Sequence, residues 1–174
     1  MRLSIDAFAH ALMIIEFVNN FKHILEIRTS HRPVRFLQHP VSVLADHLLP
    51  TLPSLQQSLL TPSLSRDLNT LCQILLRIAL DDPGIPNPKK ALTNLGQKLS
   101  EIDITEHTFS EILRIYIRER NGFDDKLTQS LSDNSFQSLI AEEKAEILAF
   151  LCNDLSTNKR VVEYVNSLAV QAVH

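Results

Sequence analysis

The sequence predicts an all-α fold, a single-domain helical bundle around a buried N-terminal helix. Apolar residues recur at spacings of three and four along the 174-residue chain, which is the period of amphipathic helices. Three glycines are too few for a sheet protein with many tight turns. A chain of this length can bury a substantial core as one domain. Because aromatic residues make up only 6% and tryptophan is absent, leucine and isoleucine are expected to build most of that core.

The first predicted helix follows a cap at Ser4 or Asp6 and runs to about residue 27. Its residues 8–25 are apolar on nearly every side, which is typical of a helix surrounded by other helices. Glu16 and three other polar residues interrupt the apolar run, so the sequence does not predict a membrane span. The apolar residues fall into two overlapping stripes, one with Ile5, Phe8, Leu12 and Ile15, the other with Ala7, Ala11, Ile14, Val18, Phe21 and Leu25.

Residues 28–50 change in character, because Pro33 and Pro40 exclude one continuous helix. The first two thirds of this segment contain no acid. Unpaired guanidinium groups are costly to bury, so its arginines are expected to be exposed to solvent: Arg28, Arg32 and Arg35.

Further helices are predicted along the rest of the chain. The sequence DDPGIPNP at 81–88 ends one of them, and Asn121-Gly122 ends another. Their approximate ranges are 41–49, 54–60, 65–80, 89–102, 108–121, 126–131, 142–155 and 158 to the tail. The core of a single domain should bury together Phe8, Leu12, Ile15, Leu75, Leu113, Ile147 and Leu148.

No motif for catalysis, a cofactor or a metal is found in the sequence. Glycine-rich phosphate loops, the G-x-S-x-G elbow and the H-E-x-x-H pair are all absent. Cys72 and Cys152 each lie in an apolar helical pattern, and two buried free thiols in a reducing compartment are predicted rather than a disulfide. Their wide separation in the sequence excludes a C-x-x-C metal pair. The three histidines of the proline-broken segment are expected to be solvated: His31, His39 and His47.

Glu16 has two interpretations, because a carboxylate in an apolar helix is costly unless it is exposed or paired. The helix could have one narrow wet strip that contains Glu16, Asn20 and Asn19. Alternatively, Glu16 forms a partly buried ion pair that fixes helix register, with Arg114 as its natural partner.

Several stretches resemble the DDT domain, in order and spacing, over most of residues 5–165. Residues 7–21 (AFAHALMIIEFVNNF) look like the opening helix of that family. Residues 110–114 (SEILR) and 142–151 (EEKAEILAFL) are similar to its later helices. Residues 79–86 (ALDDPGIP) and 95–102 (LGQKLSEI) resemble the subgroup in bromodomain-adjacent-to-zinc-finger (BAZ) proteins of the Toutatis-like branch. The sequence departs from the family at Lys22, where glycine is usual, and by a predicted insertion at 28–50.

The resemblance implies a nuclear, non-catalytic module of residues 1–174 that docks a chromatin-remodelling subunit to its ISWI-type ATPase partner. The formal charge of −3 suits a protein partner better than a phosphate backbone. A small-molecule substrate and a membrane are not expected as ligands. The alternative is a DNA-binding module, with weak contacts from the basic 22–35 segment through Lys22, Arg28, Arg32 and Arg35.

Overall fold

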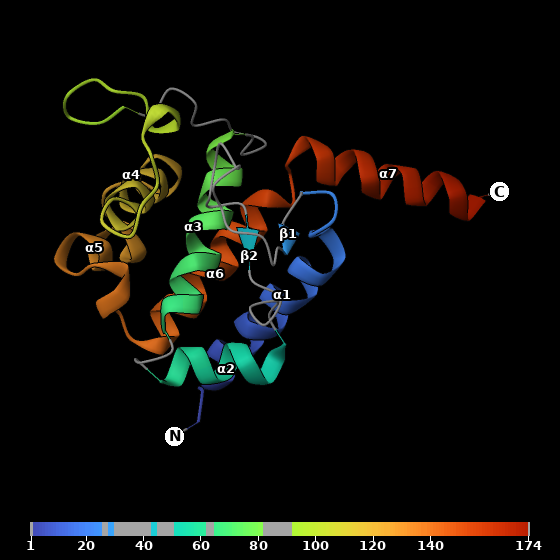
Figure 1. The fold of residues 1–174 in the computed structure, drawn as a ribbon, viewed down its shortest axis with the longest axis horizontal. Coiled ribbons are helices and arrows are strands. Elements are labelled where there is room, and N and C mark those ends of the chain that lie inside the picture. Colours follow the sequence, from blue (N-terminus) through green and yellow to red (C-terminus); the bar gives the residue numbers. More distant parts are fainter. Residues whose placement is uncertain are drawn as a thin grey trace.

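The computed structural model describes residues 2–25, 28–29, 43–44, 51–61, 65–81 and 92–173. Within these ranges nearly all regular structure is helical, which confirms the all-α prediction (Figure 1). Two 3₁₀ turns, Leu99–Glu101 and Phe136–Ser138, connect longer helices. The α-helices are α1 (Ile5–Phe21), α2 (Leu52–Leu60), α3 (Ser65–Asp81), α4 (Phe109–Asn121), α5 (Lys126–Asp133), α6 (Ala141–Leu155) and α7 (Lys159–Val173).

The core is built around α3 and α6. Helix α6 packs against α1, α2 and α3, and α3 in turn contacts α2 and α4. All ten residues from 71 to 80 of α3 are buried, so this helix is covered on every side by its own chain. Of the predicted core residues, four are fully buried: Leu75, Leu113, Ile147 and Leu148.

Helix α1 is buried on one face only, which corrects the prediction that it is surrounded. Ser4 caps it by accepting a hydrogen bond from the Ala7 amide at 3.1 Å. Phe8 and Leu12, predicted to lie in the core, are 40% and 39% exposed, and Ile15 is partly buried. The physical reason is that small side chains allow α6 to approach closely, so α6 lies on the alanine side of α1. The buried face consists of Ala7, Ala11, Ile14, Phe17 and Val18.

The predicted helix at 89–102 is not formed in its described part. Leu92 and Lys98 instead make an antiparallel bridge, closed by a turn in which Gly96 has a φ of 79°. Glycine adopts that left-handed conformation without steric cost, so the turn is locally favoured over a helix. Leu95 at the tip is 95% exposed, while Leu99 in the following 3₁₀ turn is buried.

Residues 28–50 contribute the two strands of the described chain, each of two residues, and the fold class remains all-α. Strand β1 (Arg28–Thr29) pairs in parallel with β2 (Val43–Leu44). A strand at Val43–Leu44 also replaces part of the helix predicted at 41–49. Residues 30–42 and 45–50 lie outside the described residues. The predictions that Arg32 and Arg35 are exposed concern residues in the first of these ranges.

The two thiols are free and buried, as predicted. Cys72 lies in α3 and Cys152 in α6. Burial raises the pKa of both thiols, because the charged thiolate is poorly solvated there.

Two absences hold for the described ranges. None of the helices seen there is both long and apolar enough to cross a bilayer. Across the same residues, no three side chains of His, Cys, Asp or Glu gather where a metal ion could sit.

Candidate interaction surface

Among the described residues, the contacts of helix α7 with the rest of the domain lie near its start. Val161 is the one residue of α7 that is buried. Arg160 donates from Nη1 to the carbonyl oxygen of Ile24 at 3.3 Å. The Tyr164 ring meets Phe21 and His23 edge-on, at centroid distances of 6.3 and 5.3 Å. These contacts place the first turns of α7 across the C-terminal end of α1.

Beyond this junction α7 projects away from the helical body (Figure 1). Four of its apolar residues recur with spacings of four, three and four, which places those four on one side of the helix. Other apolar residues of α7 lie on its remaining sides and are exposed as well: Val162, Val170 and Val173. We call Val161, Val165, Leu168 and Ala172 the α7 stripe. Past Val161 the stripe is open to solvent, and Val165 and Leu168 are 46% and 44% exposed.

The projecting part of α7 also lacks charge. Residues 164–173 contain no Asp, Glu, Lys or Arg. A helix that stays in water normally carries charged residues on its solvated side. An exposed apolar face of this kind is a candidate interaction surface, and the four-three-four spacing suits the side chains of another helix.

Positive charge gathers at the fixed end of α7, in a group that we call the basic collar: Lys22, Lys159 and Arg160. Lys22 caps the C-terminal end of α1, two residues before the Ile24 carbonyl that Arg160 contacts. Within α7 the nearest acid is Glu163, whose carboxylate lies 3.9 Å from the ammonium of Lys159.

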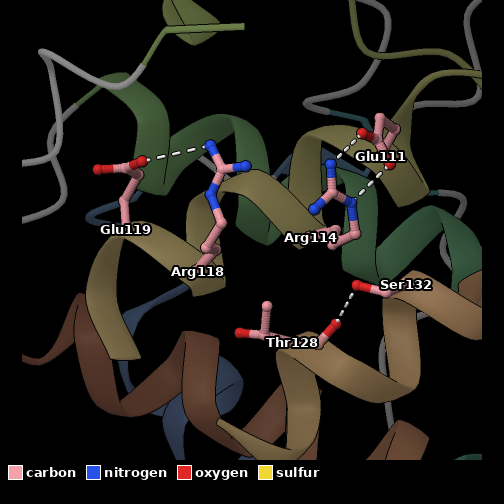
Figure 2. Close-up of polar contacts among 6 residues, drawn as sticks. All are labelled: Glu111, Arg114, Arg118, Glu119, Thr128 and Ser132. Carbon is pink, nitrogen blue, oxygen red and sulfur yellow. Dashed lines mark hydrogen bonds and ion pairs between the residues drawn. The ribbon is translucent and has the colours of Figure 1, made fainter. Parts of the chain in front are cut away.

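Glu16 is exposed on the outer face of α1, and Arg114 has a different partner. The Arg114 guanidinium donates from Nε to Glu111 at 2.8 Å and makes a second bond to the same carboxylate (Figure 2). These hydrogen bonds lower the pKa of Glu111 and raise that of Arg114. The predicted Glu16–Arg114 pair is therefore not formed, because an acid one turn away on α4 is closer. Asn19 and Asn20 are exposed beside Glu16, which matches the wet-strip interpretation.

A buried polar cluster between α4 and α6 was missed by the sequence reasoning. Asp154 accepts hydrogen bonds from the Tyr116 hydroxyl at 2.6 Å and from Arg120 Nε at 2.8 Å. The Arg120 side chain is only 5% exposed. Burial and the Asp154 carboxylate raise the pKa of Tyr116. One signal for this cluster was present in the sequence. Tyr116 and Arg120 are one helical turn apart, which places both on the inward face of α4.

The predicted DNA-contacting residues are only partly described. Lys22 is half-buried in the basic collar, and Arg28 belongs to β1. Arg32 and Arg35 lie outside the described residues. Through the Arg160 contact with Ile24, the structure brings the start of α7 near the end of α1 that carries Lys22, a proximity that sequence distance conceals.

Residues 122–166 match the WHIM1 family, described as motif 1 of WSTF, Itc1p and MBD9 among others, a stretch that includes α5, α6 and the first turns of α7. The chain is 33% identical over 165 residues, 94% of its length, to bromodomain adjacent to zinc finger domain protein 2 of Caenorhabditis elegans. It is 33% identical over 167 residues (94%) to the 2B protein of Gallus gallus, and 31% identical over 167 residues (95%) to the 2A protein of Mus musculus. It spans 10%, 7% and 8% of the lengths of these three relatives. No solved structure matches the chain.

Proposed function

The chain belongs to the bromodomain-adjacent-to-zinc-finger family, as its resemblance to the DDT domains of that family predicted, and we propose that it is a non-catalytic protein-interaction module. In this proposal the module docks a chromatin-remodelling subunit to its ISWI-type ATPase partner in the nucleus. The module is one DDT-like domain over residues 1–174 with a core at about 5–165.

The observation that supports this function is the uncovered α7 stripe. The rest of the chain buries all of residues 71–80 in α3, whereas residues 164–173 of α7 are uncharged and mostly exposed. Burying apolar side chains against a partner releases roughly 25 cal/mol per Å². A protein surface can provide that burial, whereas a small substrate or a phosphate backbone cannot.

DNA binding is the second candidate, and the basic collar is the observation that favours it. Its three cations can meet few phosphates at once, so the expected affinity for duplex DNA is weak and falls steeply with salt. The apolar stripe next to the collar offers nothing to a phosphate backbone.

The test is reconstitution of the purified chain with a purified ISWI-type ATPase subunit. We expect a complex that survives nuclease treatment and moderate salt, because apolar contacts are not screened by ions. Duplex DNA titrated into the chain alone should bind weakly. Tight, sequence-selective DNA binding without affinity for the ATPase would reverse the two candidates.

A further inference from the structure

We propose that Asn121 is a site of spontaneous modification, at which the backbone nitrogen of Gly122 closes on the side-chain amide and converts the residue to aspartate or isoaspartate. The end of α4 that carries Asn121 sets the rate, because the reaction needs the last turn of that helix to open. Water is the only other reactant, so the modification is independent of the partner that the module binds.

The reactive pair occurs once in the chain. Asn121 is the only asparagine of the sequence that is followed by glycine. A side chain on the following residue hinders the approach of its nitrogen to the asparagine amide, and glycine has none. The sequence therefore places the least hindered nucleophile directly after Asn121.

The structure leaves room for ring closure at this position. Asn121 is the last residue of α4, and Gly122 caps the helix with a φ of 93°. Residues 121–124 are all exposed. A Cβ added at Gly122 would meet no atom within 4 Å, so the space beside this residue is open to water.

One hydrogen bond restrains the reacting nitrogen in the folded chain. The Gly122 N–H donates to the carbonyl oxygen of Arg118 at 2.7 Å and closes the last turn of α4. The nitrogen attacks only after it has lost its proton, so this bond must open first. Hydrogen bonds at helix ends open without the rest of the fold. We therefore expect the reaction to follow fraying of the end of α4 and not unfolding of the core.

The chemistry balances with water as the co-reactant. The Gly122 nitrogen forms a bond to Cγ of Asn121 while the bond from Cγ to Nδ2 breaks, and the amide group leaves as ammonia with the proton from Gly122. Water then opens the cyclic imide at either of its two carbonyl carbons, which gives aspartate or isoaspartate. Isoaspartate differs in that it adds a methylene group to the backbone.

The two products should affect the fold differently. Both place a carboxylate at the C-terminal end of α4, where the helix dipole favours cations. Arg118 and Arg120 in the last turn supply such cations, and Arg118 is three residues from the new carboxylate. Asn121→Asp should therefore melt within about 2 °C of the original chain. The isoaspartate product, separated by chromatography, should melt lower, because its longer backbone moves Gly122 away from the Arg118 carbonyl.

Peptide mapping by mass spectrometry tests the site, after incubation of the full chain at physiological pH and temperature. Asn121 should gain the mass that separates an acid from an amide at least about tenfold faster than Asn166, which lies inside α7 and is followed by serine. Asn121→Gln should remove the gain, because the longer side chain closes a ring less readily. Equal rates at the two asparagines, or no gain at Asn121, would overturn the assignment.

Urea distinguishes fraying of the helix end from unfolding of the whole domain. Opening of a single turn exposes little surface, so the rate at Asn121 should change less than about twofold below the unfolding transition. Across the transition it should rise to the rate of a free peptide of residues 117–126. A rate that follows the unfolded fraction from the lowest urea concentrations would overturn control by the helix end. So would a folded chain that reacts as fast as the peptide, because the Gly122 hydrogen bond would then give no protection.

Discussion

Helices α3 and α7 have similar lengths and similar apolar content, yet α3 is buried by the rest of the chain and α7 is mostly exposed to solvent. Residues 71–80 of α3 are all buried, beneath neighbours that include α2, α4 and α6. In α7 only Val161 is buried, and the stripe beyond it faces solvent. The difference shows that an apolar pattern indicates a face that needs cover, without indicating whether the same chain or another molecule provides it.

The same substitution in the two helices should give the largest contrast. Leu75→Ala in α3 is expected to lower the free energy of unfolding by about 3 kcal/mol, because it leaves a cavity in a fully packed core. Leu168→Ala in α7 should change it by less than about 0.5 kcal/mol, because that side chain is exposed. Urea unfolding followed by circular dichroism measures both. Equal losses would mean that α7 is covered in the free chain.

Replacing the arginine that anchors each helix should likewise cost more stability in α3 than in α7. Arg77 on α3 donates to the carbonyl oxygens of Ser100 and Ile102, at 3.2 and 2.7 Å. Arg77→Met is expected to cost about 2 kcal/mol of stability, since it leaves half-buried acceptors without a charged donor. Arg160→Met at the base of α7 should cost about 1 kcal/mol or less, judged by the same urea titration. A larger loss at Arg160 would show that the α1–α7 junction supports the core.

Removing the outer part of α7 should have a smaller effect still. A chain that ends at Asn166 keeps Val161 and Tyr164, which make the contacts with α1. Its melting temperature should stay within about 2 °C of the original, because the deleted residues are exposed. The far-ultraviolet signal should fall by the contribution of the missing helical turns. Loss of cooperative unfolding in the shortened chain would show that the outer part of α7 supports the core.

The smallest expected effect concerns the ion pair on α4. Arg114 lowers the pKa of Glu111, so the pair adds stability above the unfolded pKa of about 4.3 and loses it as pH falls through the lower folded value. The Glu111 side chain is 61% exposed, so solvent screening limits this contribution to about 0.5 kcal/mol or less. The stability difference between the original chain and Arg114→Gln should therefore shrink from pH 7 to pH 3. A difference that grows on acidification would contradict the assignment.

Much of the helical framework was predictable, because caps and breakers are local signals. Ser4 caps α1, and α4 ends at Asn121 followed by Gly122, both as predicted. The prediction failed where long-range contacts choose between local alternatives. Nothing in residues 5–21 shows that α6 packs on the alanine side, so Phe8 and Leu12 were placed in the core by mistake.

The candidate surface was only partly predictable for the same reason. The last helix was predicted from residue 158 to the tail, but the exposure of its apolar residues depends on how the rest of the described chain packs against it. The basic collar joins Lys22 to residues more than a hundred positions away, through the Arg160 contact with Ile24. The Glu16–Arg114 pair was a plausible tie between helices only because the local competitor Glu111 was overlooked.

The two buried thiols can report transient opening of the core. With no tryptophan in the sequence, intrinsic fluorescence offers only a weak report on the core. Cys72 and Cys152 lie in the two helices at its centre, and burial keeps both as protonated, unreactive thiols. A thiol reagent can modify them only when α3 and α6 part, so the rate of modification follows the fraction of molecules in which the core is open. Since α7 has no cysteine, the same reagent is insensitive to motion of the projecting helix.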